Sequence, residues 1–130
     1  MKRSSFVSLS LLITLITLFA CSKNDPEKGI IGKWQLIKDE YYTDGQLTKT
    51  VSYEGSVLLT FASNGNYIIE ADGRITDSGL FTVSDTYLTL VSTEYGGPYT
   101  EILMIQSLNR KELILVDSYR EIWSYLTKIH

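Results

Sequence analysis

Beyond Gly29, apolar and polar residues alternate in short runs, and turn-forming residues interrupt these runs at close intervals. Alternation with a period of two is typical of a strand with one buried face, whereas an amphipathic helix repeats its apolar residues every three or four positions. The chain beyond Gly29 has the first pattern and not the second. We therefore expect one all-β domain over residues 30–130.

The turn residues divide this domain into eight expected strands. Asn64-Gly65 and Asp72-Gly73 are the clearest hairpin turns, because these residue types tolerate the positive φ that tight turns require. The expected strands cover residues 32–42, 56–62, 67–71, 74–83, 87–92, 101–108, 113–116 and 119–127. The polar segment 43–55, between the first two strands, is expected to be a loop.

Eight antiparallel strands in sequence order leave two open sheet edges unless the sheet closes on itself. A closed up-and-down β-barrel removes both edges, and eight strands enclose room for side chains or for one small ligand. A membrane-spanning barrel is the alternative, but it needs about 9–11 residues per strand and a lipid-facing apolar band. Most strands here are shorter, and Lys38, Glu70 and Glu121 lie within them. We predict an eight-stranded antiparallel up-and-down β-barrel that does not span a membrane.

The first twenty residues have a different pattern. Lys2 and Arg3 precede a largely apolar run, residues 6–20, which stops at Cys21, the only cysteine. A basic start, an apolar stretch and small residues before a cleavage site are typical of a secretory signal. As a helix at about 1.5 Å per residue, the run would span roughly 22 Å, less than the roughly 30 Å of a bilayer core. A cleaved signal is therefore favoured over a transmembrane helix.

The end of this run, Leu18-Phe19-Ala20-Cys21, resembles the bacterial lipobox. The resemblance implies a lipoprotein signal peptide over residues 1–20, acyl chains such as palmitate on Cys21, and a flexible tether over residues 21–29. Each buried methylene contributes about 0.8 kcal/mol, so more than one chain anchors a protein stably. Ser22 implies sorting to the outer membrane, with the periplasmic or surface side left open. The alternative is an unmodified Cys21 within an ordinary signal peptide.

The charged residues exclude several functions. Loss of Lys2 and Arg3 with the signal would leave a net charge of −5 and no basic stripe, so we expect no nucleic-acid partner.

The only histidine is His130, and no cluster has metal-ligand spacing, so we expect neither a metal nor a cofactor. Asp39 and Glu40 occupy successive strand positions and point to opposite sides. With no motif that pairs a nucleophile with a base, we expect a protein that is not an enzyme.

Four segments, IIGKWQLI, LTFASNGNY, SGLFTVSDTYLTL and LNRKELIL, occur in this order along the chain. Together they resemble the lipocalin-like domains of small bacterial lipoproteins, with Gly32-Lys33-Trp34 similar to the G-x-W of lipocalins. The resemblance implies a structural role for Trp34, which would plug one end of the barrel under a basic residue from the last strands. Arg120 is the first candidate for that residue, and Arg110 is the second.

Two functions remain open. In the first, the barrel is a cup for a small hydrophobic or amphipathic ligand, and segment 43–55 is a lid over its mouth. The candidate wall residues offer apolar faces, and the tyrosines among them add hydroxyl groups. They are Tyr53, Tyr67, Phe81, Tyr87, Met104 and Tyr125. Ordinary core packing is the alternative role for each of them.

In the second, side chains fill the barrel, and the protein is an interaction module or an inhibitor in the cell envelope. Exposed tyrosines are common anchors of protein interfaces. Tyr41, Tyr42, Tyr95 and Tyr99 lie near expected loops and are the candidates. The state of the barrel interior distinguishes the two functions, because an apolar cavity of roughly 300 Å³ or more would support a ligand.

The lipid anchor can be tested separately from the fold. Replacement of Cys21 by Ala should move the protein from the membrane fraction to the soluble fraction, because the thiol that carries the acyl chains is removed. Cell fractionation followed by immunoblotting measures this distribution. A Cys21→Ala protein that stays in the membrane fraction would contradict lipid attachment at this residue.

Overall fold

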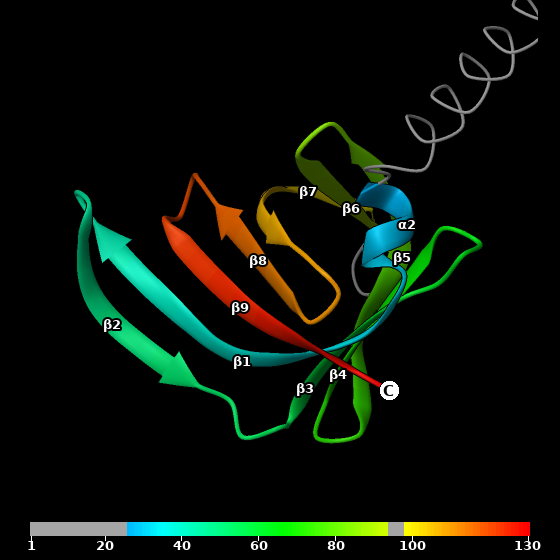
Figure 1. Ribbon diagram of the computed structural model, residues 1–130, viewed down its shortest axis with the longest axis horizontal. Coiled ribbons are helices and arrows are strands. Elements are labelled where there is room, and N and C mark those ends of the chain that lie inside the picture. The colour runs from blue at the N-terminus through cyan, green and yellow to red at the C-terminus, as the bar shows by residue number, and fades with distance from the viewer. Residues whose placement is uncertain (1–25, 94–97) are drawn as a thin grey trace, which may run out of the picture.

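The computed structural model describes residues 26–93 and 98–130. This part of the chain forms one short helix and nine strands (Figure 1). They are α2 (Pro26–Ile30), β1 (Gly32–Thr43), β2 (Gln46–Ser52), β3 (Val57–Phe61), β4 (Asn66–Ala71), β5 (Arg74–Ser84), β6 (Tyr87–Ser92), β7 (Tyr99–Leu108), β8 (Glu112–Asp117) and β9 (Ile122–Ile129). The lipobox and Tyr95 lie outside the described residues.

Strand β1 closes the sheet into a barrel. One edge of its first half pairs with β3, from Gly32↔Phe61 to Gln35↔Leu58, and its other edge pairs with β9. Each strand from β3 to β9 pairs antiparallel with the next. Strands β1 and β3–β9 therefore form a closed eight-stranded barrel, which confirms the predicted all-β up-and-down fold.

The predicted loop over residues 43–55 is wrong. Residues Gln46–Ser52 form β2, which pairs with the second half of β1 after a tight turn at Asp44 and Gly45, both with positive φ. Strand β2 lies on the same edge of β1 as β3, and the two follow one another with a break at residues 53–56. All of β2 except Val51 is exposed, so no alternation of apolar residues marked it as a strand.

The predicted tether is also wrong at its carboxyl end, because Pro26–Ile30 form α2. Ile30 is fully buried, and the Trp34 indole Nε1 donates a hydrogen bond of 2.8 Å to the Ile30 carbonyl oxygen. Five residues are too few to show a helical period. No helix within residues 26–93 and 98–130 is long and apolar enough to cross a membrane.

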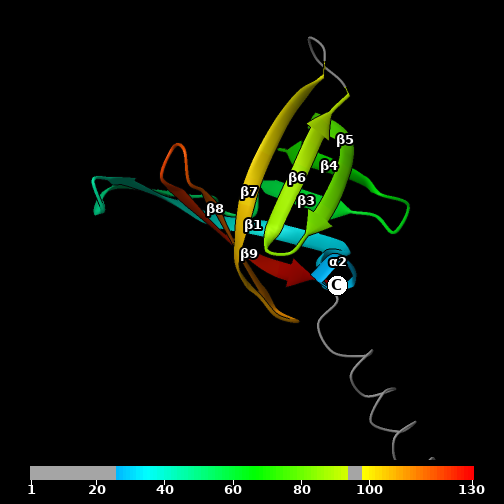
Figure 2. The ribbon, with the colours of Figure 1, turned by 90° about the horizontal axis from the view of Figure 1, so that it is seen from above.

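The helix lies at the closed end of the barrel, where large apolar side chains fill the interior. The buried core contains Ile30, Trp34, Phe61, Tyr67, Phe81, Leu88, Leu90, Leu113, Leu115 and Leu126. The Phe61 and Phe81 rings meet edge to face, with 5.1 Å between their centroids. Figures 1 and 2 show the tips of the β1–β2 and β8–β9 hairpins on the side of the molecule away from α2, at the open end.

The basic residue that covers Trp34 is Lys128, not Arg120. The Lys128 Nζ lies 5.3 Å from the centroid of the Trp34 ring and donates a hydrogen bond of 3.1 Å to the Ile31 carbonyl oxygen. Gly32, with φ of 137°, leaves room for this arrangement, because a Cβ there would lie 2.8 Å from the Lys128 Cε. Arg120 instead forms an ion pair with Asp117 at the open end.

The two tryptophans should differ sharply in their effect on stability. Trp34→Phe removes the hydrogen bond to Ile30 and leaves a void in a fully buried site, so we expect the free energy of unfolding to fall by about 2 kcal/mol or more. Trp123→Phe, at a partly buried position, should cost less than about 1 kcal/mol. Urea denaturation of the two variants makes the comparison. Equal losses would contradict the role of Trp34 as the plug of the closed end.

Candidate functional site

The interior of the barrel changes from apolar at the closed end to polar at the open end. Residues directly opposite each other on paired strands share a face of the sheet. Glu101 lies opposite the buried Leu90, and Tyr99 lies opposite the buried Ser92, so both face the interior. By the same reasoning the interior face includes Asp39, opposite Ser124, Asp77, opposite Ile69, and Asp117, two residues beyond the buried Leu115.

Asp77 is the centre of a hydrogen-bond network just above the core. Its Oδ2 accepts hydrogen bonds from the hydroxyls of Tyr67 at 2.9 Å and Tyr99 at 3.2 Å. Its Oδ1 accepts bonds from the Ser92 hydroxyl at 2.6 Å and the Ser78 backbone N–H at 2.9 Å. Burial by itself would raise the pKa of the Asp77 carboxyl, but these donors outweigh it and lower the pKa. Asp77 is therefore held as a carboxylate.

Asp39 organises the opposite wall in the same way. Its Oδ1 accepts a hydrogen bond of 2.6 Å from the Ser124 hydroxyl, and its Oδ2 accepts one of 2.9 Å from the Tyr53 hydroxyl. Burial and the hydrogen bond to Asp39 raise the pKa of Tyr53 to about 12, so its hydroxyl stays protonated and donates. This contact ties the break between β2 and β3 to the rim of the barrel.

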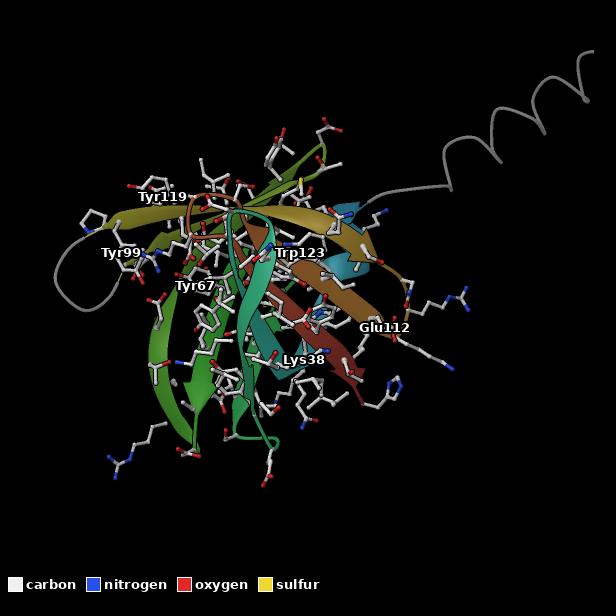
Figure 3. All side chains as sticks on the ribbon, turned by 90° about the vertical axis from the view of Figure 1, so that its left-hand side faces the viewer. Lys38, Tyr67, Tyr99, Glu112, Tyr119 and Trp123 are labelled. Carbon is white, nitrogen blue, oxygen red and sulfur yellow. The ribbon has the colours of Figure 1, made fainter. Side chains whose placement is uncertain are left out.

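A cleft of about 520 Å³ opens beside this polar interior. Pairing between β7 and β8 begins at Met104↔Val116, so the first half of β7 diverges from β8, and the cleft lies between it and the β8–β9 turn. Figure 3 shows Tyr99 and Tyr119 close together at this rim. The lining residues are Tyr99, Thr100, Glu101, Ile102, Asp117, Tyr119 and Arg120.

The charged side chains that line the cleft differ in the partners that they have. The Arg120 Nε lies 3.7 Å from the Asp117 Oδ2, and the Asp117 Oδ1 accepts the backbone N–H groups of Tyr119 and Arg120 at 3.1 Å each. Glu101 has no such partner within residues 26–93 and 98–130. Burial chiefly raises the pKa of the Glu101 carboxyl, and repulsion from Asp117 adds to the effect against the attraction of Arg120.

These carboxylates do not form a metal centre. In the described part of the chain, no group of three or more His, Cys, Asp or Glu side chains is placed to hold a metal ion. The cleft instead combines aromatic and apolar surface from Tyr99, Ile102 and Tyr119 with a half-buried carboxylate and a guanidinium. Such a set can bind an amphipathic molecule through both kinds of contact.

The structure separates the six predicted wall residues. Tyr67 and Phe81 belong to the packed core, 2% and 5% exposed, although the Tyr67 hydroxyl reaches the open end. Tyr53 lies at the rim. Tyr87, Met104 and Tyr125 do not line the interior, because each is adjacent in its strand to an inward residue, such as Leu88 or Leu126, and so points outward.

Sequence reasoning missed the polar residues of the interior. The sequence predicts Tyr99 as a surface residue near a loop, and it assigns Asp77, Asp117 and Glu101 no part in the site. A signal was present in β5, where Asp77 follows the inward alternation of Phe81 and Gly79, and in β7, where Glu101 follows that of Ile105 and Leu103. This alternation was hard to recognise in the sequence, because polar residues occupy the outward positions of these strands as well.

Solved structures share this fold. A lipocalin-like protein from Bacteroides uniformis superposes with a TM-score of 0.59 at 22% identity, over 78% of this chain and 99% of that one. An uncharacterized protein from Bacteroides eggerthii gives 0.58 at 17% identity, over 77% and 99%. No family model and no curated protein matches the sequence. The protein therefore has a lipocalin-like fold, as its strand pattern and motifs predicted.

Glu101 and Asp77 should respond to pH with opposite signs. Folding raises the pKa of Glu101, so its carboxylate lowers stability above its unfolded-state pKa of about 4.3. Folding lowers the pKa of Asp77, so its contribution is present above about pH 3.9 and is lost as the pH falls through the folded-state pKa. At pH 7, Glu101→Gln should add about 0.5 kcal/mol, whereas Asp77→Asn should cost about 1–3 kcal/mol.

Urea denaturation at pH 7 and pH 3 measures both effects. Both differences from the wild-type protein should shrink at pH 3, because Glu101 becomes protonated and the contribution of Asp77 declines below its unfolded-state pKa. A Glu101→Gln variant that is less stable than the wild type at pH 7 would show that the carboxylate has a stabilising partner.

Proposed function

We propose that the protein is a lipid-anchored binding protein that holds a small amphipathic ligand at the open end of its barrel. The observation that carries the proposal is the polarity gradient of the interior, which ends in a cleft of about 520 Å³ beside Glu101. Ligand pockets in proteins usually measure about 300–1,000 Å³. The lipocalin-like fold agrees with binding rather than catalysis.

The lining of the cleft indicates the chemistry of the ligand. Tyr99, Ile102 and Tyr119 offer apolar area to one part of it, and two of them also carry hydroxyl groups. Glu101 would accept a hydrogen bond from an O–H or N–H group of the ligand, which would compensate for its partial burial. A purely hydrophobic ligand deep in the barrel fits less well, because Trp34 and other large side chains fill that end.

The anchor would orient this site. The lipobox supports acylation of Cys21, and only four residues separate Cys21 from Pro26, the first residue of α2. At about 3.5 Å per residue, five residue steps reach at most roughly 18 Å. Because α2 lies at the closed end, that end would stand next to the membrane, which we propose to be the outer membrane, and the open end would face away from it.

An interaction module or an inhibitor in the envelope is the second candidate. Its support is the outer face of the barrel, where Leu80, Tyr87 and Ile102 are 51%, 49% and 60% exposed. Exposed apolar residues that lie together are a feature of protein-binding surfaces. This function would need a protein partner and would leave the cleft empty.

Native mass spectrometry of the full chain, extracted gently from its host, tests the proposal. We expect one copy of a small amphipathic molecule per chain. Glu101→Gln should weaken its binding about tenfold, because a hydrogen bond to a charged group contributes about 1.5–3 kcal/mol. Glu112→Gln is the matched control, because Glu112 is exposed at the closed end.

If the Glu101→Gln and Glu112→Gln variants bind the ligand equally well, Glu101 is not part of the binding site. Recovery of a protein partner with an empty barrel would contradict ligand binding and favour the interaction module.

A further inference from the structure

A second hollow lies on the outer face of the barrel, between the β1–β2 turn and the β8–β9 turn. Its volume is about 270 Å³, and its lining is Tyr42, Gly45, Val116, Ser118, Glu121 and Trp123. Trp123 lies directly between Val116 on β8 and Glu40 on β1, whereas its neighbour Ser124 faces the interior. The hollow is therefore separated from the cleft at Glu101 by the barrel wall.

Two aromatic rings form the sides of this hollow. The Tyr42 and Trp123 ring centroids lie 6.1 Å apart, and the ring planes are inclined at 57°. Val116, which is only 5% exposed, forms an apolar floor. The backbone of Glu121 is held at the edge of the hollow, because its carbonyl oxygen accepts a hydrogen bond of 2.9 Å from the Tyr42 N–H.

The same face already holds an ammonium group of the protein itself. The Lys38 Nζ lies 4.7 Å from the centroid of the Tyr125 ring and 3.7 Å from the Glu40 Oε2. The Tyr42 hydroxyl donates a hydrogen bond of 3.3 Å to the other oxygen of Glu40, so this group and the hollow are adjacent. On this surface, an aromatic ring with a carboxylate beside it thus binds the ammonium group of a lysine.

The hollow combines two rings with Glu121, an exposed acidic residue of its lining, and none of its lining residues is basic. We infer that the hollow binds a small organic ammonium group, such as a methylated amine. Ring faces attract a cation through their quadrupole, and an alkylated ammonium also gains from contact with Val116. The volume is several times the roughly 30 Å³ that one water molecule occupies in the liquid, so such a group has room. The net negative charge of the chain favours the approach of cations.

Fluorine NMR of the full chain with 5-fluorotryptophan, in a neutral maltoside detergent, tests this inference. The sequence has two tryptophans, and Trp34 is fully buried, so the Trp123 resonance reports on the hollow alone. Choline is the probe, and its uncharged isostere 3,3-dimethylbutan-1-ol is the matched ligand control. We expect choline to shift the Trp123 resonance saturably, to leave the Trp34 resonance in place, and to bind at least about fivefold more tightly than the alcohol.

Variants locate the effect. Glu121→Gln should reduce the affinity for choline towards that for the alcohol, whereas Glu112→Gln should leave it unchanged, and an unshifted Trp34 resonance shows that each variant is folded. Mixed micelles of phosphatidylcholine and the same maltoside identify the source of the ammonium group: a response to this lipid but not to free choline would assign it to a lipid headgroup. Equal affinity for choline and the alcohol, no shift of Trp123 with either choline or the lipid, or an unaffected Glu121→Gln variant would overturn the inference.

Discussion

A β-bulge in β1 determines which side chains of the second half of this strand face the interior and which face the surface. The register of β1 against β9 shifts between Leu36 and Lys38. Before the shift, Trp34 and Leu36 face the core, and strict alternation would send Lys38 inward after them. The extra residue reverses the faces, so that Asp39 points inward to Ser124 and Lys38 points outward over Tyr125. The Asp39 contacts at the polar mouth and the Lys38–Tyr125 contact on the outer face both depend on this reversal.

Strand β1 can carry this irregularity because it is held from both sides along its length. Its first half pairs with β3, its second half pairs with β2, and β9 pairs with nearly all of it. Below the bulge, Trp34 is fixed by a hydrogen bond to Ile30 and by Lys128. The packing at the closed end therefore supplies stability that the open end does not need to provide. The open end can then tolerate a half-buried carboxylate such as Glu101.

The two hollows use aromatic side chains in different ways. At the cleft, tyrosine hydroxyls organise carboxylates, as Tyr67 and Tyr99 do at Asp77, and so make a polar surface within the barrel. On the outer face, the rings of Tyr42 and Trp123 are themselves the binding surface. Both hollows adjoin the β8–β9 turn, which places Arg120 beside the cleft and Glu121 beside the outer hollow. This short turn thus contributes a charge of opposite sign to each.

Local chemistry in the sequence was enough to predict the barrel. The positive-φ turns at Gly65 and Asp72-Gly73, with alternation on either side, determined the hairpins and hence the all-β fold. Strand β2 escaped prediction because both of its faces are exposed, so that backbone pairing with β1 and not a hydrophobic pattern makes it a strand.

The site depended on the register between strands, which a single strand does not encode. Lys128 rather than Arg120 meets Trp34 because it lies directly opposite on β9. Tyr87, Met104 and Tyr125 are excluded from the interior because each alternates with an inward neighbour, and the pairing of Tyr87 with Met104 puts both on the outer face. Pairing of β5 and β7 with the two edges of β6 brings Asp77 and Glu101 to one mouth, because both side chains lie on the inner face at the same end of these strands. The sequence by itself determined the eight strands of the barrel and their order, whereas the tertiary structure decided which side chains meet.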